Sequence, residues 1–141
     1  MNNSINPAYE DTTEVEALLV GRRIVKIKRV KNGSENGDLA ILTLDNGTKI
    51  ELGGHDGGCA CSSGCYELGH LTDLSEVDNI ITSVLFDSSG VTSGSYEELG
   101  GEYRIFVFAG NRAIQLAGFD GDDGNGYYGT GYYLTVKDPR S

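Results

Sequence analysis

The most unusual chemistry in the sequence lies in a short segment where cysteine, histidine and glycine crowd together. His55 opens this segment, and the cysteines follow with the spacing Cys-x-Cys-x3-Cys. Thiolates and imidazoles this close together can supply four ligands to tetrahedral zinc, and glycines would let the backbone fold around the ion. The spacing differs from the usual Cys-x2-Cys knuckle and has no distant second pair. The predicted ligands of a structural zinc site are Cys59, Cys61, Cys65 and His70.

Two other interpretations of this segment stay open. Free cysteine behaves as a small hydrophobic residue, so the thiols can also be buried and unligated in a tight loop. A nucleophilic cysteine assisted by His55 or His70 is a third interpretation, which requires a geometry that the sequence does not supply. The cofactor prediction is therefore none, or a structural zinc ion.

Tyrosine is concentrated near the C-terminus, where four of the eight tyrosines form two adjacent pairs separated by Gly-Thr-Gly. Aromatic pairs beside bare backbone can form a platform on which a flat ring stacks. Neighbouring side chains in a strand point to opposite faces, so one tyrosine of each pair is also expected in the core. The preceding acidic segment, residues 120–126, does not fit a calcium-binding EF-hand loop and is predicted to be a solvated turn.

Basic residues are concentrated in one strip, because six of the eleven lie between Arg22 and Lys31. Arginines at a helix-to-strand turn are well placed to bind phosphate with two hydrogen bonds. The alternative is that the strip protects the edge of a sheet from pairing with other chains. Taken together, the residues predicted to contact a ligand are Arg22, Arg23, His55, Tyr127, Tyr128, Tyr132 and Tyr133.

Overall charge and composition exclude several classes of protein. A net charge of −10 disfavours direct binding to nucleic acid, whose phosphates attract surplus lysine and arginine. The sequence holds no apolar run long enough for a membrane span and no signal-peptide pattern, which predicts a cytosolic protein. It contains no phosphate-cradling glycine motif, nucleophile elbow or metal-binding His-Glu-x-x-His helix. We therefore expect a protein that is not an enzyme.

The order of apolar runs and turns predicts a mainly β fold. Residues 1–12 are predicted to be a flexible tail, followed by a short helix that ends at Gly21 and a single β-rich domain over residues 13–138. Asn46-Gly47 and Gly110-Asn111 each lie between two strand-like runs and predict two hairpins. The segment at 88–102 is predicted to be a loop. About seven or eight antiparallel strands are expected, arranged as a sandwich, a small barrel or a bent sheet.

The Cys-rich segment and the aromatic C-terminus together resemble a family of small uncharacterised proteins encoded mainly by bacteriophages. The resemblance covers residues 50–136, and this sequence departs from the family pattern by separating two cysteines with Ala60 and by adding Cys65. The family has no assigned activity, so the resemblance implies a viral setting and no mechanism. The residues that carry it are His55, Cys59, Cys61, Tyr66, the strand at 79–86, the hairpin at 103–117 and Asn125 to Tyr128.

These observations lead to a functional hypothesis. We expect a phage-encoded, non-catalytic binding protein of the host cytoplasm that acts in counter-defence or host takeover, with a nucleotide-derived immune signal as the most concrete ligand. A homo-oligomer could build a pocket that one small chain cannot enclose. One alternative is an acidic inhibitor that mimics nucleic acid and docks onto a host protein. Another is a zinc-stabilised structural or accessory phage protein.

Overall fold

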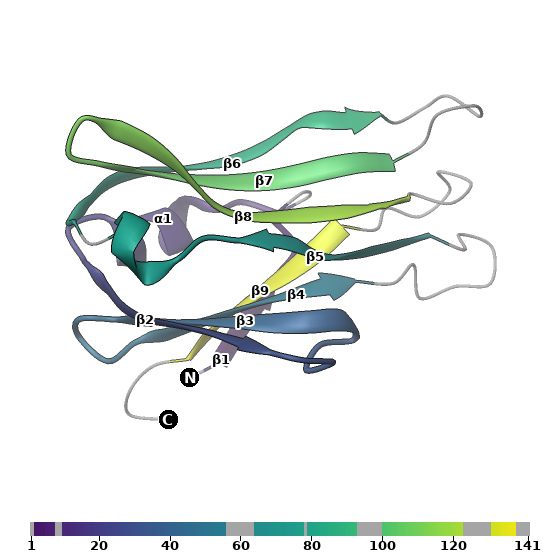
Figure 1. Cartoon of the computed structure of the whole chain (residues 1–141), viewed down its shortest axis with the longest axis horizontal. Coiled ribbons are helices and arrows are strands. Elements are labelled where there is room, and N and C mark those ends of the chain that lie inside the picture. The colour runs from purple at the N-terminus through teal and green to yellow at the C-terminus, as the bar shows by residue number, and fades with distance from the viewer. Residues whose placement is uncertain are drawn as a thin grey trace.

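The computed structural model of the chain describes residues 2–7, 10–55, 64–77, 79–92, 100–122 and 131–137. Within them the chain forms nine strands, one short α-helix and one 3-10 turn (Figure 1). The elements are β1 (Asn2–Ile5), α1 (Thr13–Leu19), β2 (Ile24–Val30), β3 (Asn36–Leu44), β4 (Lys49–His55), β5 (Cys65–Leu71), η1 (Leu74–Val77), β6 (Ile81–Thr92), β7 (Gly100–Ala109), β8 (Arg112–Asp122) and β9 (Gly131–Lys137).

The strands form two antiparallel sheets that face each other. The five-stranded sheet has the order β1-β9-β4-β3-β2, and the four-stranded sheet has the order β5-β8-β7-β6. Figure 1 shows the four-stranded sheet above the five-stranded one, with the tight hairpins and α1 at one end. This arrangement confirms the prediction of a mainly β fold with a short N-terminal helix.

Local turn chemistry explains the two tight hairpins. Gly47 adopts φ +89° between β3 and β4, and Leu44 donates its N–H to the Thr48 carbonyl at 2.8 Å. Gly110 adopts φ +60° between β7 and β8. Glycine reaches this left-handed region without the steric cost that other residues meet there, so the chain reverses at these two points.

The core fills the space between the inner faces of the two sheets. Inward residues alternate with outward ones along β7 and β9, as expected for sheets with one buried face. Four aromatic rings lie together in this core, each from a different strand. Tyr132 stacks on Phe119 with ring centroids 4.4 Å apart and planes within 5°, and it also lies 5.8 Å from Tyr103, which meets Tyr66 edge-on.

Two sets of hydrogen bonds join the sheets at their margins. On one margin, Asn36 of β3 and Arg29 of β2 donate to backbone carbonyls of β5. On the other, Gly21 donates to the Ile81 carbonyl and Ile81 donates to the Arg22 carbonyl, both at 2.8 Å. Gly21 has a φ of +83°, and Gly21 and Arg22 together lie opposite the single residue Ile81, which is the hydrogen-bond pattern of a β-bulge. The chain therefore leaves α1 already attached to β6.

Three sequence-based expectations were wrong in part. The N-terminal tail includes β1, whose residues pair with β9 from Asn2 opposite Lys137 to Ile5 opposite Leu134. Parts of the loop expected at 88–102 are strand, because β6 continues to Thr92 and β7 begins at Gly100. Residues 120–122 of the predicted acidic turn belong to β8, where strand pairing on both sides overrides the turn preference of Asp and Gly.

Among the described residues, no helix is long and apolar enough to cross a membrane.

Candidate functional site

A partly buried tyrosine on the outer face of the five-stranded sheet packs over a glycine of the neighbouring strand. Tyr133 is opposite Gly53 in the pairing of β9 with β4, and a Cβ added at Gly53 would lie 2.5 Å from Tyr133 Cζ and 2.7 Å from Ser34 Cβ. The phenol end of Tyr133 therefore occupies the space that a side chain at position 53 would fill. We call Ser34, Gly53, His55 and Tyr133 the Tyr133 site.

His55 is the polar member of the Tyr133 site. It ends β4 and is opposite Gly131, so it lies on the same sheet face as Tyr133, on the diagonal. Its Nδ1 atom is buried and has no hydrogen-bond partner in the part of the chain that the structure describes. A buried polar atom without a partner costs free energy, and a ligand that reaches this nitrogen could recover that energy.

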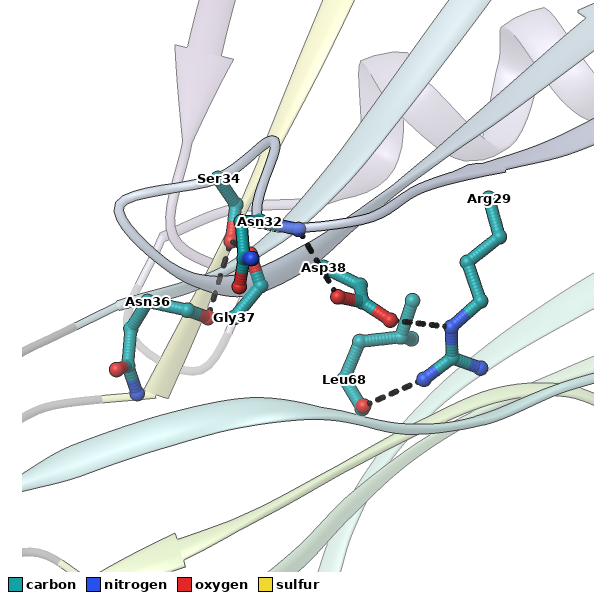
Figure 2. A network of polar contacts seen from close by, with 7 residues as sticks. All are labelled: Arg29, Asn32, Ser34, Asn36, Gly37, Asp38 and Leu68. Atoms are coloured by element: carbon teal, nitrogen blue, oxygen red, sulfur yellow. Dashed lines mark hydrogen bonds and ion pairs between the residues drawn. The ribbon is translucent and has the colours of Figure 1, made fainter.

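Ser34 lies in the turn between β2 and β3, and a network of polar contacts fixes the shape of this turn (Figure 2). Ser34 Oγ donates toward the carbonyls of Asn36 and Gly37, both at 3.0 Å. Asp38 accepts hydrogen bonds from Arg29 Nε at 2.7 Å and from the Asn32 backbone N–H at 3.0 Å. The turn therefore has a defined shape, although Asn32 adopts the uncommon φ of +55°.

The same network attaches this turn to the opposite sheet. Arg29 Nη2 donates to the Leu68 carbonyl at 3.1 Å (Figure 2). Asn36 Nδ2 donates to the Tyr66 carbonyl at 2.9 Å. The Arg29 guanidinium, followed by the Asn32 N–H, holds the pKa of Asp38 below its usual value. The Asp38 carboxylate thus stays charged at neutral pH and keeps Arg29 directed at β5.

Lysines gather on the same outer face, farther from the turn. Strand pairing aligns Lys26 with Thr43, Thr43 with Lys49, and Lys49 with Lys137, so that one row crosses four strands. Lys137 forms an ion pair with Glu51 at 2.7 Å. Lys137 and Tyr133 are four residues apart on β9, a separation of about 13 Å in an extended strand. We call Lys26, Lys28, Lys49 and Lys137 the lysine face.

Carboxylates gather instead on the four-stranded sheet. Asp120 of β8 is directly opposite Glu67 of β5 on one side and Glu102 of β7 on the other. Like charges in this register repel each other, which destabilises a sheet. Arg104 lies 3.9 Å from Glu102 and provides limited compensation at one end of the row. We call Glu67, Asp120 and Glu102 the acidic row.

The two sheets therefore carry opposite charge. Strands of the five-stranded sheet hold five basic and two acidic side chains, while strands of the four-stranded sheet hold five acidic and two basic ones. The first set consists of Lys26, Lys28, Arg29, Lys49 and Lys137 with Asp38 and Glu51, and the second of Glu67, Asp87, Glu102, Asp120 and Asp122 with Arg104 and Arg112.

The structure brings together only part of the ligand site predicted from the sequence. His55 and Tyr133 share one face, whereas Arg22 lies 3.7 Å from Asp45 at the opposite end of β4 and β3. The length of β4 alone separates these ends by about 20 Å. Arg22 and its neighbour Arg23 are thus not part of the Tyr133 site within one copy.

Tyr132 belongs to the core and not to the ligand platform. Its side chain is 1% exposed and stacks on Phe119. Burial, and to a lesser degree the nearby Tyr103, raises the pKa of Tyr132 above its usual value. Strand alternation had predicted one inward and one outward tyrosine, and this is confirmed for Tyr132 and Tyr133. Tyr127 and Tyr128 lie outside the described residues.

The predicted zinc ligands are not assembled in the part of the chain that the structure describes. Cys65 and His70 are five residues apart on β5, about 16 Å in an extended strand. Ligands of one zinc ion lie about 4 Å from each other, so these two cannot share an ion in this conformation. His70 Nε2 instead lies 3.3 Å from the Gln115 carbonyl. Cys59 and Cys61 lie outside the described residues.

Sequence reasoning missed Ser34, Gly53, the lysine face and the acidic row. The Gly53-Gly54 pair at the end of a strand is a signal that another group packs closely against the backbone there, but the sequence does not identify that group. The two charged surfaces depend on which strands become neighbours, and that is set by long-range pairing.

Comparison with known proteins gives a family and no activity. A family model described as "Domain of unknown function (DUF7448)" matches residues 17–134, which is more than half of the chain. No curated protein and no solved structure matches the chain. The chain therefore belongs to the DUF7448 family.

Proposed function

We propose that this member of the DUF7448 family is a non-catalytic binding protein that captures a small anionic ligand carrying a flat ring. The observation that carries the proposal is the placement of Tyr133 over Gly53, beside His55 and on the same sheet face as four lysines. These groups offer stacking, hydrogen bonding and positive charge. In the viral setting inferred from the resemblance, the ligand class is a nucleotide-derived immune signal of the host cytoplasm.

In the proposed complex, the two ends of the ligand bind at two places on the outer face of the five-stranded sheet. An aromatic ring can stack on any nucleobase, because every nucleobase has a π face. Lys137 lies about 13 Å from Tyr133 along β9, a span that suits a ligand with a base at one end and phosphates at the other. Since the strands of the other sheet carry an excess of acidic side chains, an anion close to the surface would favour the lysine face.

Replacing Tyr133 with alanine tests this proposal directly. Loss of a base-stacking ring costs roughly 1–3 kcal/mol, so the affinity for a bound nucleotide should fall about 5- to 150-fold. Tyr133→Phe, which keeps the ring, should bind within a few fold of the wild type. Isothermal titration calorimetry with cyclic dinucleotides and ADP-ribose nucleotides measures both. Absence of binding by the wild type to every member of this set would refute the proposal.

A second candidate function rests on the acidic row, and here the partner would be a basic surface on a host protein. Three carboxylates in direct register destabilise the free protein, and a basic partner would neutralise them on binding. The row would thus imitate the regular negative charge of a nucleic acid backbone. This candidate uses the other sheet and is independent of the Tyr133 site.

Asp120→Asn tests whether charge repulsion within the acidic row lowers the stability of the folded protein. Asp120 has a carboxylate on both sides, so removal of its charge should raise the free energy of unfolding by about 0.5–1 kcal/mol at low salt. The gain should shrink at high salt because exposed charges are screened. Denaturant unfolding at two salt concentrations measures the effect, with Asp73→Asn of the loop before η1 as a control. A destabilised Asp120→Asn protein would argue that Asp120 makes a structural contact instead.

A further inference from the structure

The two sheets have four edge strands, and three of them are protected against pairing with another chain. β1 has only four residues, and β2 carries Lys26, Lys28 and Arg29. The carbonyls of Tyr66 and Leu68 on β5 accept hydrogen bonds from side chains of the other sheet. Short length, lysines and covered backbone are the usual means by which natural edges avoid association.

The fourth edge, β6, is neither short nor lysine-bearing, and beyond its first residue its backbone is not covered. Register shifts between Ile81 and Ser83 and between Asp87 and Gly90 interrupt it, which leaves a regular stretch from Ser83 to Asp87. It is 12 residues long, and Asp87 is its one ionisable residue. Only Ile81, through the bulge at Gly21 and Arg22, is bonded on the open side to another described segment. In Figure 1 β6 forms the upper border of the four-stranded sheet. A long edge with a single ionisable residue presents unpaired N–H and C=O groups to a further strand.

Apolar side chains accompany this open edge. Leu85 is 48% exposed at the middle of β6 and is opposite Phe106, while Phe108 follows on the same face. Ile80, directly before β6, is 52% exposed. A strand added at this edge would cover exposed surface of Leu85, and removing apolar surface from water is favourable.

Electrostatics favour a second copy of this chain at the β6 edge. Each copy has a net charge of −10, so most surfaces of two copies repel each other. At β6 the charge is locally balanced, because Asp87 accepts the Ser89 N–H and lies 2.9 Å from Arg104 Nη2. The β6 edge therefore brings no unneutralised carboxylate of its own strand into the contact.

We propose that β6 pairs antiparallel with β6 of a second copy about a two-fold axis, which joins the two four-stranded sheets into one continuous sheet. This arrangement closes on itself, as most soluble homodimers do. With the axis near Leu85, the two Leu85 side chains would lie across from each other beside the two Phe106 rings. The proposal does not depend on what the Tyr133 site or the acidic row binds.

Leu85→Lys tests the interface by placing a charge at the proposed axis, once in each copy. Analytical ultracentrifugation of the wild-type chain should show a dimer at micromolar concentration, and Leu85→Lys should raise the dissociation constant at least about 100-fold. Leu74→Lys is the matched control, because Leu74 is also an exposed leucine, at 38%, but lies on η1. It should leave the dimer intact, and circular dichroism should confirm that both variants fold.

Hydrogen exchange locates the interface independently of the substitutions. Amides of residues 83–87 should exchange more slowly as the protein concentration rises, whereas those of the protected edge β2 should not change. The proposal would be overturned by a monomer at roughly 100 µM, by a dimer that Leu85→Lys leaves intact, or by protection that appears on β2 instead of β6. An assembly that dissolves in salt would also overturn it, since that indicates pairing of the lysine face with the acidic row.

Discussion

Tyr132→Ala should lower the free energy of unfolding by about 3–5 kcal/mol. The ring is 1% exposed, stacks on Phe119 and contacts Tyr103, so its removal leaves a cavity lined by aromatic rings from other strands. Aromatic pairs contribute beyond the area that they bury, which places this substitution at the upper end of core truncations. Because total stability of such domains is about 5–15 kcal/mol, the variant should be close to unfolding.

Chemical denaturation followed by circular dichroism measures this effect, and Tyr132→Phe is its control. Phenylalanine keeps the stacked ring and should cost no more than about 1.5 kcal/mol, the contribution of a typical hydrogen bond. Tyr133→Ala, one residue away on the opposite face, should cost much less than Tyr132→Ala. Equal losses at positions 132 and 133 would contradict the assignment of one ring to the core and the other to the surface.

Gly54→Ala should destabilise the protein by at least about 3 kcal/mol, although it adds a single methyl group. The new Cβ would collide with the Tyr66 carbonyl oxygen and would lie 2.5 Å from the Asn36 carbonyl oxygen. Both obstacles are backbone atoms, so relief requires β5 to move away from β4 and β3. Overpacking that forces side chains and backbone to shift costs about 1–3 kcal/mol and occasionally more, and a collision with two backbone oxygens belongs at the upper end of this range.

Gly69→Ala on β5 is a matched control for this collision. Its Cβ would meet Asp120 Oδ2, the far end of a flexible side chain, which can rotate away. Thermal unfolding should therefore show a large decrease in midpoint for Gly54→Ala and a small one for Gly69→Ala. A mild effect at Gly54 would indicate that β5 is not held against the five-stranded sheet as closely as the structure shows.

Local patterns in the sequence predicted the parts of the fold that depend on near neighbours. The hairpin at Asn46-Gly47 follows from the left-handed preference of glycine, and the inward and outward directions of Tyr132 and Tyr133 follow from strand alternation. β1 could not be predicted in this way. Its polar residues form a strand because β9, at the other end of the chain, offers an open edge.

The candidate site depends almost wholly on long-range pairing. Tyr133 lies over Gly53 because β9 inserts between β4 and β1, which no local pattern indicates. Lys49 and Lys137 are 88 positions apart in the chain and become direct neighbours by the same insertion. The sequence drew attention to the basic strip and the paired tyrosines, but it could not show that Arg22 lies at the far end of the sheet from Tyr133.

Opposite charge on the two sheets gives the molecule an electric dipole moment across the sandwich. A dipole experiences a torque in the field of a charged body, so the protein would rotate before it touches a partner. Near the surface, an anionic group would favour the five-stranded sheet and a cationic group the four-stranded sheet. Such pre-orientation raises the fraction of productive collisions, and it should weaken as added salt shortens the range of the field.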